Sequence, residues 1–132
     1  MLIDLVKRFS STPLAATMNL NGMMVRVATN DQVVLDRLRV ASTASGGDIS
    51  APATVDWRIV VERDGDASDI EFALNGFTHD GLSFIRISRG SFLAGDLQAR
   101  CGISFVTSDL ITEEHIFGQY FLPALMSMLV EM

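Results

Sequence analysis

The sequence predicts an α+β fold in which helices pack on one face of a mainly antiparallel β-sheet. Segments with alternating apolar residues, the pattern of half-buried strands, gather in the middle and second half of the chain, and segments with helical spacing flank them. The strand candidates follow one another too closely for the crossover of a dozen or more residues that a parallel pair needs. A length of 132 residues suits one domain, which we place at residues 1–132.

The first third of the chain predicts a helix, a hairpin and a second helix. Apolar residues recur at helical spacing over residues 2–10. Asn21 and Gly22 separate two apolar runs, which is the pattern of a two-residue β-hairpin. Asn30 is expected to cap a second helix over residues 31–41, because its side chain can accept a hydrogen bond from a free backbone N–H of the first turn.

A loop and a series of strands are expected next. Residues 42–54 are small, polar and rich in glycine and serine, so we expect a flexible loop there. Residues 55–63 alternate cleanly and predict a half-buried strand with Trp57 in the core. The further expected strands cover about residues 69–74, 82–88, 91–97 and 101–107, with turns at Asn75-Gly76, Asp80-Gly81 and Arg89-Gly90.

The C-terminal segment, HIFGQYFLPALMSMLVEM from His115 to Met132, predicts a long helix that is apolar on nearly every side. Pro123 lies inside it and lacks a backbone N–H, so a kink is expected there. One apolar stripe is sufficient to dock against the sheet, which leaves Leu122, Met126 and Val130 on another side. An exposed apolar patch of this kind marks an interface in soluble proteins, and we expect these three residues to form the contact of a symmetric homodimer.

Composition argues against nucleic acids and membranes as partners. The formal net charge is −6, and the ten Lys and Arg residues form no basic stripe that could bind a phosphate backbone. The longest apolar stretch, residues 116–130, is shorter than the ~20 residues that cross a bilayer. Cys101 is the only cysteine, so the chain cannot form an internal disulfide, and we expect a cytoplasmic protein.

No decisive catalytic motif is present, and we predict no catalytic, cofactor-binding or metal-ligating residue. His79 and Asp80 could form an acid/base pair, but adjacent residues near Gly81 are more typical of a surface turn; they are kept as candidates for a ligand site. Cys101 is expected to be a buried thiol. The chain has no phosphate-binding G-x-x-x-x-G-K-[ST] motif and Lys7 is its only lysine, so we expect it neither to bind nor to hydrolyse ATP.

Several segments resemble the region that precedes the nucleotide-binding half of HPr serine kinase-related proteins. The resemblance runs from about Asn19 to Glu131 and rests on apolar residues, glycines and turn residues. It is carried by NLNGMMVRVATNDQVVLDRLR, VDWRIVVE, GLSFIRISRGSFLAGDLQARCGISFVTSDL and FLPALMSMLVE. In that family the apolar helix leads into a strand, a histidine-containing segment and the P-loop. The resemblance therefore implies a region without the kinase half, and none of the family's catalytic residues can be assigned to a position in this chain.

Two classes of function follow. The first is a non-catalytic accessory or protein-interaction domain whose partner is a second copy or a kinase-like domain. The alternative is a small-molecule or peptide-binding module with a pocket between sheet and helices, near the turn at His79.

Overall fold

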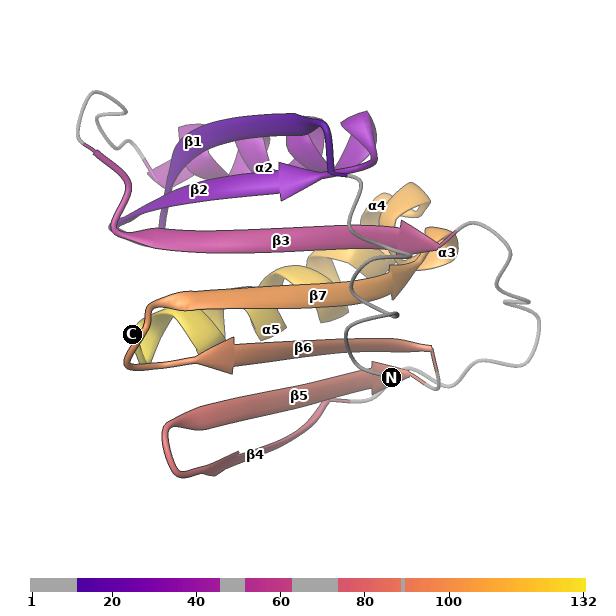
Figure 1. Ribbon diagram of the computed structural model, residues 1–132. Coiled ribbons are helices and arrows are strands. Elements are labelled where there is room, and N and C mark those ends of the chain that lie inside the picture. The colour runs from indigo at the N-terminus through magenta and orange to yellow at the C-terminus, as the bar shows by residue number, and fades with distance from the viewer. Residues whose placement is uncertain (1–11, 46–51, 63–73, 89) are drawn as a thin grey trace.

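The computed structural model describes residues 12–45, 52–62, 74–88 and 90–132. In these ranges the fold is α+β, as predicted, with one seven-stranded sheet (Figure 1). The first half contains β1 (Leu14–Leu20), β2 (Met23–Thr29), α2 (Gln32–Ser45) and β3 (Val55–Glu62). The second half contains β4 (Asn75–His79), β5 (Leu82–Ser88), β6 (Ser91–Asp96), β7 (Cys101–Thr107), α3 (Ser108–Thr112), α4 (Glu114–Ile116), the π-helical turn η1 (Phe117–Phe121) and α5 (Leu122–Val130).

The sheet is mixed, in the order β1-β2-β3-β7-β6-β5-β4. Four of its neighbouring pairs are antiparallel, but β2 pairs with β3 and β3 pairs with β7 in parallel. The closely spaced strands β4, β5, β6 and β7 are antiparallel neighbours as predicted, and the two parallel pairs join strands that are far apart in sequence. The parallel pair β2–β3 is possible because α2 lies between these strands in sequence and supplies the crossover.

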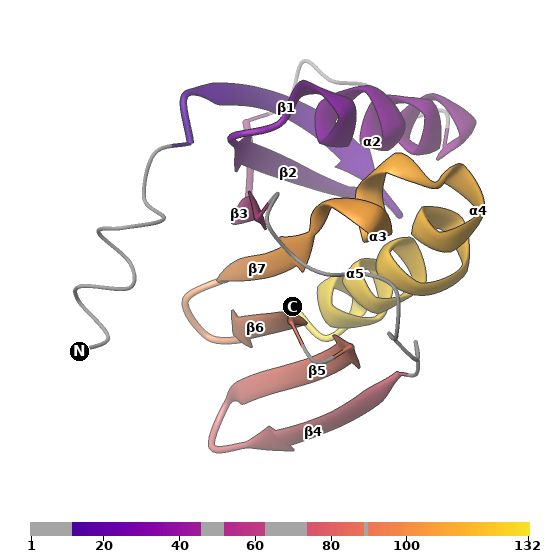
Figure 2. The same cartoon turned by 90° about the vertical axis from the view of Figure 1, so that its right-hand side faces the viewer.

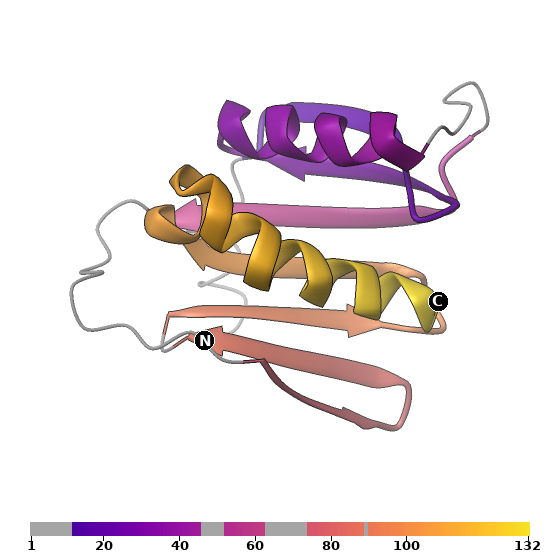
Figure 3. The same ribbon diagram turned by 180° about the vertical axis from the view of Figure 1, so that it is seen from behind.

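All the described helices cover one face of the sheet, as Figures 2 and 3 show. The space between helices and sheet is filled by one apolar cluster, to which β1, β2, β3, α2 and the C-terminal helical segment all contribute. Trp57 lies in this cluster with 1% of its surface exposed, which confirms the sequence prediction. Its Nε1 donates a hydrogen bond to the Ser104 hydroxyl at 2.7 Å, so the one polar atom of the ring is satisfied.

Two hairpins turn through residues with positive φ. Asn21 and Gly22 have φ of 54° and 87°, and Asp80 and Gly81 have φ of 51° and 79°. Two successive positive φ values define a type I′ turn, whose twist matches that of the flanking strands. The turns predicted at these two dipeptides are confirmed.

Other local predictions were wrong. Asn75 and Gly76 form no turn but begin β4, where they pair with Arg86 and Ile85 of β5. Helix α2 runs to Ser45 and so includes the first four residues of the expected loop. Ser42 is buried there because its hydroxyl accepts the backbone N–H of Asn19 at 3.1 Å, which ties α2 to β1.

The start of α2 also differs from the prediction. Asp31, and not Asn30, caps the helix by accepting the N–H of Val33 at 2.9 Å. Asn30 instead bonds to both backbone groups of Val61 in β3, at 3.0 and 2.8 Å. Three predicted segments lie outside the described residues. They are the helix over residues 2–10, residues 46–51 of the expected loop, and nearly all of the strand expected at 69–74.

In the C-terminal segment α4, η1 and α5 follow one another directly, with a π-helical turn in the middle; the single long helix, apolar on nearly every side, stays a prediction. Within η1 the hydrogen bond of Leu122 N–H reaches back five residues to the carbonyl of Phe117. This wider turn ends where Pro123, which has no N–H to donate, stands at the start of α5. Arg37 of α2 anchors the segment, because its guanidinium donates to the carbonyls of Ile111 and Thr112 at 2.6 and 2.7 Å.

Candidate functional site

The sheet face turned away from the helices (the open face) is the most distinctive surface of the chain. Because side chains alternate along a strand, the residues next to each core position point to this face. Phe77 stacks on Phe84 with ring centroids 5.2 Å apart, and Phe92 lies 5.3 Å from Phe105. The open face includes Arg26, Ala28, Asp56, Arg58, Asn75, Phe77, His79, Leu82, Phe84, Arg86, Phe92, Ala94, Asp96, Cys101, Ile103 and Phe105.

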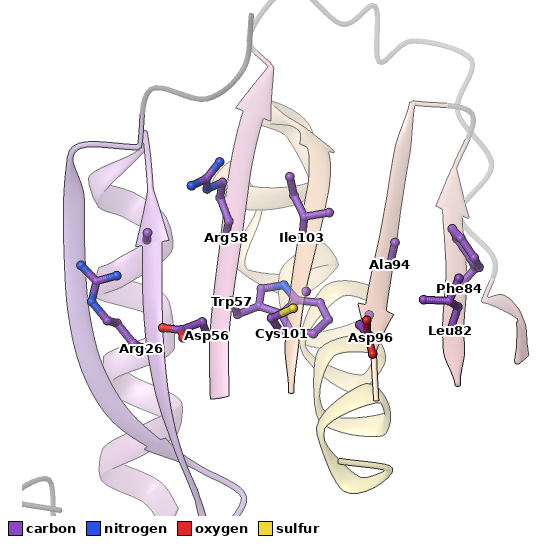
Figure 4. A pocket seen from close by; sticks show the side chains of 13 residues that line it. Arg26, Asp56, Trp57, Arg58, Leu82, Phe84, Ala94, Asp96, Cys101 and Ile103 are labelled. Carbon is purple, nitrogen blue, oxygen red and sulfur yellow. The ribbon is translucent and has the colours of Figure 1, made fainter. Parts of the chain in front are cut away.

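A hollow of about 570 Å³ lies on the open face, over β2, β3, β7, β6 and β5 (Figure 4). The sheet register places four residues in one row across the hollow, in the order Arg26, Asp56, Cys101 and Asp96. Asp56 pairs with both Arg26 and Cys101, and Cys101 pairs with Asp96. Its apolar part is lined by Ala28, Leu82, Phe84, Ala94 and Ile103.

Charges of both signs line the hollow. Arg58 stands two residues after Asp56 on the same face, so the two arginines and this carboxylate lie together on β2 and β3. Within the described ranges, no hydrogen bond or ion pair holds either guanidinium. Asp96 is fixed differently, because its Oδ1 accepts the N–H groups of Gln98 and Ala99 at 3.1 and 3.0 Å.

This arrangement can bind an anionic group. The lining has two arginines and two aspartates, with both arginines on β2 and β3 and Asp96 on β6, so the positive charge is concentrated at one side of the hollow, beside an apolar floor. A guanidinium without a partner is suited to a carboxylate or phosphate, which it can hold through two parallel hydrogen bonds.

Cys101 was predicted to be buried and is exposed at the rim of the hollow. It begins β7, and its neighbours in the sheet are Asp56 and Asp96. Neither is a base that could activate a thiol as a nucleophile of the cysteine–histidine type.

His79 and Asp80 lie at the β4–β5 turn. His79 Nε2 is 3.2 Å from an oxygen of Asp80, but the two side chains are 81% and 84% exposed. A contact between side chains so open to water is worth little, and these residues do not line the hollow on the open face. Leu82, which pairs with both His79 and Asp96, lies between this turn and the hollow.

A second concave surface, the helix groove, lies between α2 and η1. It has a volume of about 480 Å³ and an apolar lining with charged residues at its edge. Val40 is 71% exposed and Val33 is 37% exposed, and both line the same groove as Leu122. The groove is lined by Val33, Asp36, Arg37, Val40, Ala41, Glu114, Phe117, Gly118 and Leu122.

The three residues expected to form a dimer contact are in different environments. Leu122 and Met126 are half-buried and pack against the core, whereas Val130 is 68% exposed. The stripe expected to dock on the sheet is buried at Phe117, Phe121, Ala124, Leu125, Met128 and Leu129.

Over the ranges that the structure describes, no three His, Cys, Asp or Glu residues are grouped as metal ligands would be. None of the helices found there is both long enough and apolar enough to cross a membrane. Comparison of the chain with protein-family models, with curated proteins and with solved structures gave no match in any of the three.

Sequence reasoning missed the hollow, although part of its signal was visible. The alternation of MMVRVAT and VDWRIVVE places Arg26, Asp56 and Arg58 opposite the core positions of their strands. Pairings between distant segments make these two strands neighbours. The same kind of pairing places Asp96 and Phe84 across from them.

Proposed function

We propose that this chain is a non-catalytic accessory domain that acts in the cytoplasm through protein contacts. Its partner in this proposal is a kinase-like, nucleotide-binding domain of the HPr serine kinase-related type. The proposal rests on the resemblance of the sequence to the region preceding such domains and, above all, on the exposed apolar side chains of the helix groove.

The helix groove has the composition of an interface. Val33, Val40 and Leu122 supply apolar lining, and Asp36 and Glu114 add charged groups to it. Protein interfaces commonly combine an apolar, water-excluding centre with a polar rim. Arg37 gives the groove a fixed shape, because its hydrogen bonds to α3 and its position 5.9 Å from the Phe117 ring hold α2 against the C-terminal segment.

Val40→Glu should weaken binding to the kinase-like domain. The side chain is 71% exposed in the free chain, so the change should not disturb folding, whereas in a complex the new carboxylate would be buried without a partner. We expect a dissociation constant raised about tenfold or more, measured by sedimentation velocity with a purified P-loop domain of this type from the same organism.

Val130→Glu is the matched control, because Val130 is exposed to a similar degree on α5 but does not line the groove. It should leave the affinity unchanged. Absence of a complex at tens of micromolar, or equal affinity for Val40→Glu and the unmodified chain, would contradict the proposal.

The hollow on the open face supports the alternative, a module that binds a small molecule or peptide. Arg58 pairs with Ile103, from which the apolar lining continues through Ala94 to Phe84, so a ligand with a carboxylate and an aromatic or aliphatic body would use both parts. This position differs from the sequence expectation of a pocket between sheet and helices, where the core cluster lies.

A short peptide with a free C-terminus tests this alternative. We expect Ala-Ala-Phe to bind measurably by calorimetry, and its C-terminally amidated form to bind more weakly because it lacks the carboxylate. Arg58→Ala should remove the difference between the two peptides. Equal heats for both peptides with the unmodified chain would exclude carboxylate recognition in the hollow.

A further inference from the structure

Among the described residues, β4 is an edge strand that lacks the protection edges normally have. It forms the last strand of the sheet and pairs only with β5 among the described strands (Figure 1). All five of its residues, NGFTH, are exposed, and Phe77 keeps 66% of its surface in contact with water. Stable monomers usually block such edges with lysine, proline, a bulge or a covering element, and β4 itself contains no lysine, proline or carboxylate.

The opposite edge of the sheet is different. In β1 the N–H of Asn19 is already used by the Ser42 hydroxyl of α2, and Met18 and Leu20 are buried. Helix α2 therefore occupies part of that edge, which makes β4 the better template for pairing with another strand.

The backbone groups available on β4 follow from its hairpin. In a two-residue type I′ hairpin the residues flanking the turn, here His79 and Leu82, form a hydrogen-bonded pair. Hydrogen-bonded and non-hydrogen-bonded pairs then alternate along the ladder, so His79, Phe77 and Asn75 direct their N–H and C=O groups to β5. The N–H and C=O groups of Gly76 and Thr78 are left pointing to the free edge.

We propose that two copies of this chain pair through β4, antiparallel and about a two-fold axis at Phe77. Placing Gly76 opposite Thr78 of the second copy uses every free backbone group of both residues, in four main-chain hydrogen bonds. Registers centred on Gly76 or on Thr78 leave some of these groups without a partner. The sheets of the two copies then join into one.

Side chains are compatible with this register. Phe77 faces Phe77 of the second copy as a non-hydrogen-bonded pair, in which side chains approach most closely. The two rings extend the stack that Phe77 already makes with Phe84. Asn75 lies opposite His79 of the second copy, so no two like charges face each other, and Gly76 leaves room for the opposing Thr78.

Disulfide trapping tests the register itself. In a non-hydrogen-bonded pair the Cα atoms are about 4.5 Å apart, within the range that a disulfide bridges. Phe77→Cys in a Cys101→Ser background should therefore form a covalent dimer on mild oxidation in dilute solution. Thr78→Cys in the same background is the matched control, because the two Thr78 residues are two positions out of register, and it should remain largely monomeric on a non-reducing gel.

The molecular mass of the chain in solution tests the proposal without introducing cysteines. The unmodified chain should sediment as a dimer at high micromolar concentration, and Phe77→Lys should raise the dissociation constant about tenfold or more by placing two ammonium groups across the axis. Val130→Glu and Val40→Glu should leave the dimer intact, so this interface is separable from the helix groove. A monomer at all concentrations, equal trapping of the two cysteine variants, or a dimer lost with Val130→Glu but kept with Phe77→Lys would each overturn the proposal.

Discussion

Replacing Trp57 by alanine should lower the free energy of unfolding by about 3 to 5 kcal/mol. The ring is 1% exposed at the centre of the core cluster, and it lies across Gly102 of the neighbouring strand β7. Its removal creates a cavity under the middle of the sheet and also leaves the buried Ser104 hydroxyl without the indole N–H. Urea unfolding followed by far-ultraviolet circular dichroism measures the change.

Phe92→Ala provides the comparison for this prediction. Phe92 is also aromatic and also lies on the sheet, but on the open face with 38% of its surface exposed. Its loss should cost clearly less than the loss of Trp57. If the two variants unfold at the same urea concentration, Trp57 does not contribute to stability as its burial implies.

Local signals in the sequence predicted the elements that depend only on neighbouring residues. The dipeptides Asn21-Gly22 and Asp80-Gly81 adopt positive φ at low cost, and both became type I′ turns. The alternation around Trp57 placed it correctly in the core, because a strand with one buried face has a period of two residues.

Pairing between distant segments was not predictable in the same way. Strand β7 lies between β3 and β6, and nothing within VDWRIVVE or CGISFVT specifies that these two strands are parallel neighbours. Asn75-Gly76 has the composition of a turn, yet pairing with β5 overrides that preference. The first turn-like residues of 42–54 remain helical, and the buried Ser42 bonds to β1 there.

The same distinction applies to the candidate sites. Arg26 and Arg58 could be placed on the outer face from alternation alone, but the hollow exists only because five strands bring its lining together. The helix groove depends on how α2 meets η1. The π-helical turn lies just before Pro123, and a helix can accommodate the missing N–H of a proline in more than one local geometry. The homodimer contact expected at Leu122, Met126 and Val130 is an untested alternative to pairing through β4, and the Val130→Glu variant distinguishes the two interfaces.

Gly102→Ala should also destabilise the fold, although alanine is the better strand residue. A Cβ atom at this position would overlap Cζ3, Cη2 and Cε3 of the Trp57 ring, which is buried and cannot swing into solvent. Overpacking of a core costs about 1 to 3 kcal/mol, which exceeds the gain of about 0.5 to 1 kcal/mol that alanine brings over glycine within a strand.

The sign of this effect should reverse when the ring is removed. Gly102 has no positive φ, so its backbone conformation is one that alanine adopts freely, and the Trp57 ring is the obstacle to a side chain there. In the Trp57→Ala background the overlap is gone, the new methyl group fills part of the cavity, and Gly102→Ala should stabilise the chain. A double-mutant cycle by urea unfolding measures the coupling. Gly90→Ala is the control for a glycine away from the ring, because Gly90 is exposed and lies beside Thr107. If Gly102→Ala has the same effect with and without the indole, the two residues are not coupled and the close packing of β3 on β7 at this point does not determine the stability of the sheet.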